Sequence, residues 1–265
     1  MINENNKIKK AFDTPNKKAF IGFLTAGDPD GDSTVKFILE MERAGADMIE
    51  IGIPFSDPTA EGVVIQEANI RALKGGMTTD GVFEIVRKVR EVSDIPLCFM
   101  TYLNPVFHYG YEHFFAKCEE LGVDGIIIPD LPYEEKAEVE EPASAHNVAV
   151  ISMIAPTSES RIRMIAQQAE GFIYVVSSMG VTGVRKEIST DIASIVESIR
   201  KVTKTPCAIG FGISTPKQAG NMAAVSDGSI VGSAIVKIIA QNGSGSAPKL
   251  YEYVKAMKEA VAEAQ

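Results

Sequence analysis

Eight short apolar segments, spread over the whole chain, constrain its fold more than any other feature. They cover residues 19–27, 47–53, 95–102, 122–130, 148–156, 171–180, 205–213 and 227–235. Their apolar residues run consecutively instead of alternating with polar ones, which is typical of parallel strands covered on both faces. Helical stretches lie between them; residues 81–92, for example, place Val82, Ile85, Val86 and Val89 on one helix face.

This alternation predicts parallel strands joined by right-handed helical crossovers. Eight such units in 265 residues favour an α/β fold of the (β/α)8 TIM-barrel type, which takes about 250 residues. A doubly wound sheet stays open as an alternative, because periodicity does not report whether a sheet closes. No change in composition marks a boundary, so residues 1–265 are expected to form one barrel domain. An extra helix in the first dozen residues is expected to cover the barrel floor.

Composition limits the classes of function. The net charge of −9 argues against a nucleic-acid or anionic-membrane binder, because either needs a basic face. No apolar run approaches the roughly 20 residues of a membrane span, and the N-terminus lacks the apolar stretch of a secretory signal. Cys98, Cys118 and Cys207 have no redox or metal spacing and predict reduced thiols and a cytoplasmic location. The three histidines form no zinc pattern, so no metal is expected.

Glycine-bearing loops follow the last three expected strands, at residues 177–183, 210–214 and 231–235. Phosphate groups in barrels are commonly held by the loops after strands seven and eight. The N–H groups of Gly232, Ser233 and Ala234 would lie at a helix N-terminus, which favours anions. Any one of these loops could be an ordinary tight turn, but three on adjacent strands favour a phosphate site.

Glu50 lies between Ile49 and Ile51 in a strand that should be buried on both faces. With a side-chain period of two, Glu50 points opposite to its neighbours and into the barrel lumen. Burial without a partner raises the pKa of a carboxyl group, so Glu50 could donate and accept a proton near neutral pH. The alternative is an ion pair with a neighbouring strand, although no expected strand supplies a lysine or arginine.

Other polar residues follow the expected strands. Asp57 and Glu61 lie in the loop after the second, Tyr102 and Asn104 after the third, and Asp130 after the fourth. Each could serve a pocket or simply stabilise a turn, a helix start or a solvated loop. No lysine falls on the C-terminal half of an expected strand, which disfavours a Schiff-base aldolase. No set of histidine, aspartate and glutamate suggests a metal aldolase either.

These residues and the motifs that contain them resemble those of a known family. Over essentially its whole length the chain resembles the tryptophan synthase α subunit family, a family of (β/α)8 lyases. The matching motifs are TAGDPD (25–30), EIGIPFSDP (50–58), IIIPDLPYEE (126–135), SSMGVTG (177–183), GFGIS (210–214) and GSAIVK (232–237). Together and in this order they are specific; singly, only the second is.

The resemblance implies an activity in tryptophan biosynthesis, the cleavage of indole-3-glycerol phosphate to indole and glyceraldehyde 3-phosphate. It also implies a tryptophan synthase β subunit as partner, in an α2β2 heterotetramer, with pyridoxal phosphate in the partner and no cofactor in this chain. The β subunit is expected against the loops at residues 57–61 and 104–105. A phosphate-binding regulatory subunit of low activity is the alternative, and a phosphosugar isomerase is disfavoured.

By the same resemblance, Glu50 is the general acid and base. The second catalytic carboxylate is Glu61, where the family commonly has aspartate, and Val63 stands where proline is usual. Thr182 is expected to close over the substrate and contact Asp57 or Glu61. The expected substrate-binding residues are Phe23, Tyr102, Asp130, Tyr174, Thr182 and Phe211. The expected phosphate-binding residues are Gly183, Gly212, Gly232 and Ser233.

Overall fold

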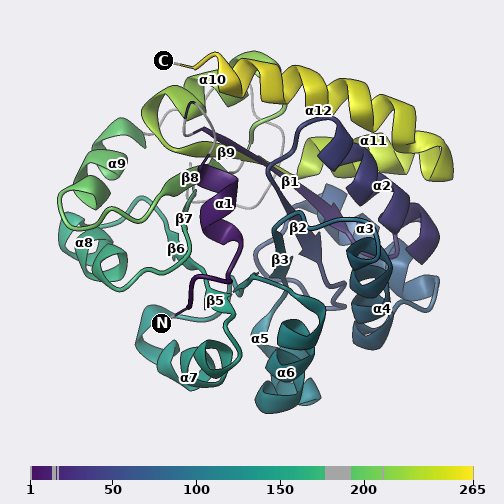
Figure 1. Cartoon of the computed structure of the whole chain (residues 1–265), viewed down its shortest axis with the longest axis horizontal. Coiled ribbons are helices and arrows are strands. Elements are labelled where there is room, and N and C mark those ends of the chain that lie inside the picture. Colours follow the sequence, from purple (N-terminus) through teal and green to yellow (C-terminus); the bar gives the residue numbers. More distant parts are fainter. Residues whose placement is uncertain (1, 14–15, 17, 177–191, 211, 265) are drawn as a thin grey trace.

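The fold is known from a computed structural model that describes residues 2–13, 16, 18–176, 192–210 and 212–264 (Figure 1). These residues form nine parallel strands in one sheet of order β5-β4-β3-β2-β1-β9-β8-β7-β6. The strands are β1 (Ala19–Thr25), β2 (Met48–Gly52), β3 (Leu97–Met100), β4 (Gly125–Ile127), β5 (Ala149–Val150), β6 (Ser152–Ile154), β7 (Ile173–Val176), β8 (Cys207–Gly210) and β9 (Gly228–Val231).

The two outermost strands of that order belong to one chain segment. β5 and β6 are separated only by Ile151 and fall within the single strand expected at residues 148–156. β5 pairs with β4, while β6 pairs with β7 on the other side. The interrupted segment thus closes the sheet into a barrel of eight strand segments. The (β/α)8 prediction is confirmed, and the doubly wound alternative is wrong.

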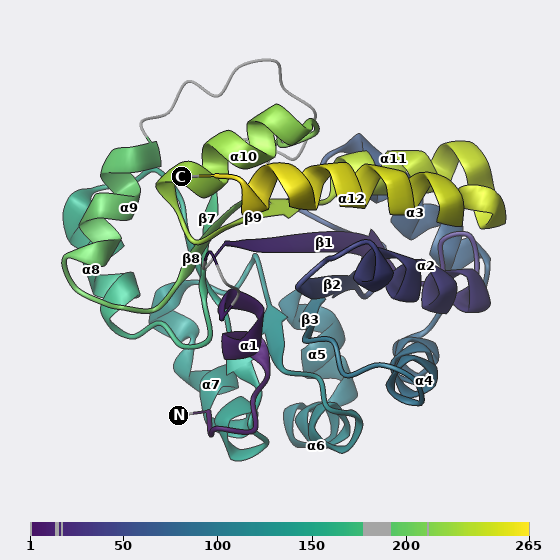
Figure 2. The ribbon, with the colours of Figure 1, turned by 45° about the horizontal axis from the view of Figure 1, so that its top comes forward.

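Helices surround the strands (Figures 1 and 2). In the described residues the α-helices are α1 (Ile8–Phe12), α2 (Gly31–Arg43), α3 (Val63–Lys74), α4 (Thr79–Arg90), α5 (Leu103–Tyr109), α6 (Tyr111–Leu121), α7 (Ala137–Ala145), α8 (Glu159–Gln167), α9 (Ile192–Arg200), α10 (Pro216–Val225), α11 (Ser233–Asn242) and α12 (Ala247–Ala262). Two short 3-10 turns add η1 (Tyr133–Glu135) and η2 (Gly243–Ser246).

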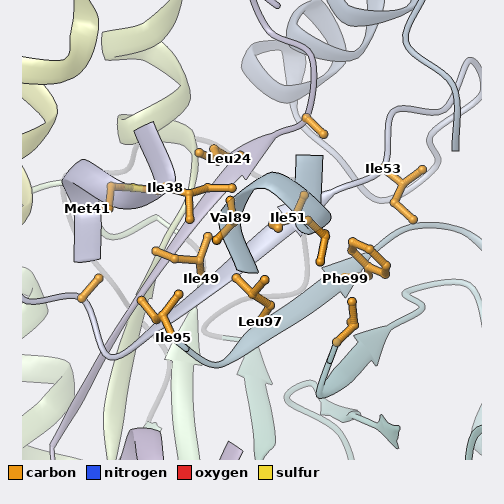
Figure 3. Packing of buried hydrophobic residues seen from close by; sticks show 14 of the residues in the cluster. Leu24, Ile38, Met41, Ile49, Ile51, Ile53, Val89, Ile95, Leu97 and Phe99 are labelled. Carbon is orange, nitrogen blue, oxygen red and sulfur yellow. The ribbon is translucent and has the colours of Figure 1, made fainter. Parts of the chain in front are cut away.

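Alternation along the strands divides the core into two regions. Ile49 and Ile51 of β2 pack outward against helices, with Ile38 and Val89 in the same cluster (Figure 3). Met48 points the other way, into a separate cluster that fills the barrel. Because side chains alternate, Glu50 lies on the same inner side as Met48. Its partners across the sheet are Phe23 of β1 and Cys98 of β3.

The helix expected over the barrel floor is α1. Ile8 is fully buried and belongs to the cluster inside the barrel, together with Ala11 and Phe12. A Cβ at Gly125, the first residue of β4, would lie only 2.9 Å from the Ile8 Cδ1 atom. The helix therefore seals the barrel at the N-terminal ends of the strands, and chemistry is left to the opposite end.

Shortening Ile8 should measure how strongly this helix is docked. The Ile8→Ala variant is expected to lose about 3 kcal/mol of unfolding free energy, because it removes buried methyl groups and leaves a cavity. Urea unfolding gives the value. Lys9 is exposed on the same helix, so Lys9→Ala should stay within about 0.5 kcal/mol of the wild type. Equal effects of the two changes would contradict the docking.

Candidate active site

Glu50 is fully buried and is the central residue of β2. Neither of its carboxylate oxygens has a hydrogen-bond partner among the described residues. Burial raises the pKa of Glu50 from 4.5 to about 8. The ion pair considered from the sequence is absent from the described part of the chain, so the group is predominantly protonated at neutral pH and can give up a proton.

Glu50 opens into a cavity at the C-terminal ends of the strands. Its walls come from β1, β2, β3, β6, β7 and β9 and from the loops between them. The lining residues are Phe23, Glu50, Ala60, Glu61, Ile65, Met100, Pro129, Met153, Tyr174, Gly212, Ile213, Ile230, Gly232 and Ser233. Most of these side chains are apolar, and the carboxyl groups of Glu50 and Glu61 lie among them. Such a pocket suits an aromatic ring that must exchange protons.

Glu61 reaches the same cavity from the loop between β2 and α3. Its Oε2 accepts a 2.7 Å hydrogen bond from Asn69 Nδ2, and its carbonyl oxygen accepts one of 2.7 Å from Gln66 Nε2. Burial raises the pKa of Glu61 to about 7, partly opposed by the Asn69 hydrogen bond. The two carboxyl groups therefore differ: burial raises the pKa of Glu50 further than that of Glu61, which has a hydrogen bond from Asn69, so Glu61 ionises first as the pH rises.

The structure brings only some of the expected aromatic residues to the cavity. Phe23 and Tyr174 are buried and line it. Tyr102 is not among the lining residues; its hydroxyl accepts a 2.9 Å hydrogen bond from the Ala60 N–H, and its ring lies 5.5 Å from that of Phe55. Tyr102 thus holds the loop that carries Glu61.

Asp130 also lies away from the cavity. Its side chain is exposed, and Oδ1 accepts a 2.9 Å hydrogen bond from the N–H of Leu103, the first residue of α5. This contact satisfies a free N–H group at a helix start. Thr182, Gly183 and Phe211 fall outside the described residues, as does most of the glycine motif at 177–183.

The remaining expected phosphate residues share one end of the cavity. Gly212, Gly232 and Ser233 all line it. Gly232 precedes α11, whose first N–H groups have no acceptor within the helix. A Cβ on Gly232 would lie 3.2 Å from the Phe23 ring, and Gly212 has a φ of +77° that favours glycine. Backbone donors and a helix N-terminus can bind an anion here.

Sequence reasoning missed several lining residues. Met100, the last residue of β3, and Met153, the middle residue of β6, supply apolar wall, and the inward alternation of those strands was the signal that could have found them. Asn69 was also missed. It is a single amide on the otherwise apolar buried face of α3, with Ile65, Ala68 and Ala72, and that position was the available signal.

Comparisons with known proteins agree on one family. The family described as tryptophan synthase alpha chain matches residues 10–263. The alpha chain of Lactiplantibacillus plantarum is 49% identical over 247 residues, which cover 93% of each chain. That of Thermoanaerobacter sp. is 44% identical over 259 residues, covering 96% of this chain and 99% of the relative.

Solved structures resemble the whole fold. The alpha subunit of Legionella pneumophila is 34% identical with a TM-score of 0.87, and the match covers 97% of this chain and 98% of that one. A chain of the a2b2 complex of Pyrococcus furiosus is 35% identical with a TM-score of 0.83, covering 91% and 98%. Among the described residues, no helix is long and apolar enough to cross a membrane.

Proposed function

The chain belongs to the tryptophan synthase alpha chain family, whose members cleave indole-3-glycerol phosphate, and we propose that Glu50 and Glu61 carry this cleavage. Glu50 moves the protons, and Glu61 stabilises the positive charge that develops on the indole ring. The observation that carries the proposal is the pair itself: two carboxyl groups of different pKa in one largely apolar cavity.

Glu50 acts first as an acid. Protonated Glu50 gives its proton to C3 of the indole, and the ring becomes an indolenine with a C=N bond. The ionised Glu50 then accepts the proton of the glycerol hydroxyl. As that hydroxyl becomes an aldehyde, the carbon–carbon bond breaks and its electron pair restores the indole. The ring of the substrate is the electron sink, and both protons pass through one carboxyl group.

Glu61 acts as the ionised partner. It accepts a hydrogen bond from the indole N–H, which becomes more acidic when C3 is protonated. Phe23 and Tyr174 line the ring site, while Gly212, Gly232 and Ser233 offer backbone donors for the phosphate. Thr182, Gly183 and Phe211 stay proposed on their motif positions. Tyr102 and Asp130 also stay proposed substrate-binding residues, although their contacts favour a role in holding loops.

A β subunit is the proposed partner, in an α2β2 assembly like the one named for the Pyrococcus furiosus relative. Pyridoxal phosphate belongs to that partner in this proposal, and this chain needs no cofactor. Asp57 is exposed on the Glu61 loop, and Phe107 has 65% of its surface exposed on α5, the helix whose first turn contains Asn104 and Pro105. These surfaces favour the predicted docking side. We also propose that residues 1–265 act as one domain in the cytoplasm.

A pH profile tests the division of roles. We expect a bell-shaped dependence of kcat/KM for indole release, with an acid limb near pH 7 and a basic limb near pH 8. Below the first limb Glu61 is protonated and cannot stabilise the ring; above the second, Glu50 has lost the proton it must give. Rates are measured with and without a β subunit.

The Glu61→Gln variant should be slower and lack the acid limb. A profile that stays flat from pH 6 to 9 would contradict the assignment. A chain that activates a β subunit but releases no indole, alone or in complex, would favour the regulatory alternative.

A further inference from the structure

Asn69 has no place in the mechanism so far, yet it makes the side-chain contact that fixes one of the two acids. We propose that Asn69 is the positioning residue for Glu61: its amide holds Oε2 and leaves the other oxygen to meet the indole N–H. This inference rests on the proposed role of Glu61. It concerns a residue on a different element, α3, eight positions along the chain.

The burial of Asn69 supports a defined role. Only 4% of its surface is exposed, and its neighbours on the same helix face are Ile65, Ala68 and Ala72. An amide at such a site costs free energy unless it is hydrogen-bonded. Its Nδ2 donates to Glu61 Oε2 at 2.7 Å, a short bond of the kind made to ionised carboxylates.

The helix that carries Asn69 is anchored independently of the Glu61 loop. Arg71, two residues further on, makes two parallel 2.8 Å hydrogen bonds to Asp28, which is 2% exposed after β1. This pair attaches α3 to the loop after β1. Asn69 is therefore a hydrogen-bond donor in a fixed position, and the Glu61 carboxylate is oriented by it.

The extra methylene of Glu61 makes such a donor more important. Glutamate has one more side-chain torsion than aspartate and loses more rotamer freedom when it is held in place. A misplacement of about 1 Å can lower a rate strongly. The hydrogen bond from α3 selects one orientation of the longer side chain before the substrate arrives.

The Asn69 amide should also affect the ionisation of Glu61. Among the described residues, the titratable groups that line the cavity with Glu61 are Glu50 and Tyr174, and Tyr102 interacts with Glu61 from beside the loop. None is a cation, and Arg71 on α3 is already paired with Asp28. The Asn69 amide is thus the contact that favours ionised Glu61 against burial, so its loss should raise the pKa of Glu61 further.

The test compares Asn69→Leu with Gln66→Leu in the full chain. Asn69→Leu keeps the branched shape of the side chain and removes the donor; the acid limb of kcat/KM should move to higher pH, and kcat at pH 7 should fall about five- to tenfold with little change in KM. Gln66 lies on the same helix but bonds the Glu61 carbonyl, so Gln66→Leu should leave the acid limb in place. If Asn69→Leu does not fold, Asn69→Ala should show the same movement.

Double variants distinguish a failure of the positioning role of Asn69 from a failure of the proposed role of Glu61. When Glu61 is already glutamine, Asn69→Leu should not slow the reaction further. An acid limb that stays in place in folded Asn69→Leu and Asn69→Ala would overturn the positioning role, and so would an equal loss of rate on the Glu61→Gln background. Wild-type rates and an intact acid limb in Glu61→Gln itself would instead overturn the proposed role of Glu61.

Discussion

Replacing Glu50 with glutamine is expected to lower kcat for indole release by about 10²–10⁴-fold, the usual contribution of a positioned acid–base group. Glutamine retains the size and polarity of a protonated carboxyl group but has no proton to give at neutral pH. The described residues that line the cavity include one other carboxyl group, Glu61, which is proposed to act in its ionised form and then has no proton to give. No nearby group should therefore take over the proton transfer.

The comparison needs a substitution that disturbs the barrel interior without touching the chemistry. Met48 lies two residues before Glu50 on the same inner side of β2, and Met48→Leu nearly conserves volume. We expect Met48→Leu to keep kcat within a few-fold of wild type. KM should change little in both variants, because Gly232 and Ser233, the proposed phosphate-binding residues, are intact. A Glu50→Gln enzyme within tenfold of wild-type kcat would disprove the proton transfer by Glu50.

The barrel and the place of Glu50 could be predicted because both follow from short-range periodicity. Consecutive apolar residues indicate strands covered on both faces, and a period of two assigns Glu50 to the side opposite Ile49 and Ile51. The glycine before α11 was predictable for the same reason, since the strand-to-helix change is visible in the sequence around Gly232. Only local geometry is needed in these cases.

Contacts between loops could not be predicted in this way. Tyr102 and Asp130 follow strand ends, but whether such a side chain faces the cavity depends on the path of neighbouring loops. Tyr102 bonds the Ala60 N–H and Asp130 the Leu103 N–H, each across a long sequence separation. Asn69 meets Glu61 only because α3 folds back along the loop that precedes it. The interruption of the fifth strand segment at Ile151 likewise depends on pairing with two different neighbours.

The second large effect of Glu50→Gln concerns stability and has the opposite sign to its effect on rate. The folded state raises the pKa of Glu50 from 4.5 to about 8, so the native protein binds this proton more tightly than the unfolded chain does. Stability from this group is fully present below pH 4.5 and is lost as pH rises through about 8. The difference corresponds to roughly 5 kcal/mol, whereas glutamine does not titrate.

Glu50→Gln should therefore be as stable as the wild type near pH 5 and more stable by several kcal/mol at pH 9. Urea unfolding of both proteins at pH 5, 7 and 9 measures the difference in unfolding free energy. The titration of Glu61 contributes equally to both proteins and so does not affect this difference. A difference that does not grow with pH would mean that water or a cation reaches Glu50 in the folded protein. Growth with pH, together with the loss of kcat, would show that one property has both effects: the burial that destabilises an ionised Glu50, which has no hydrogen-bond partner among the described residues, is what keeps its proton available for the substrate.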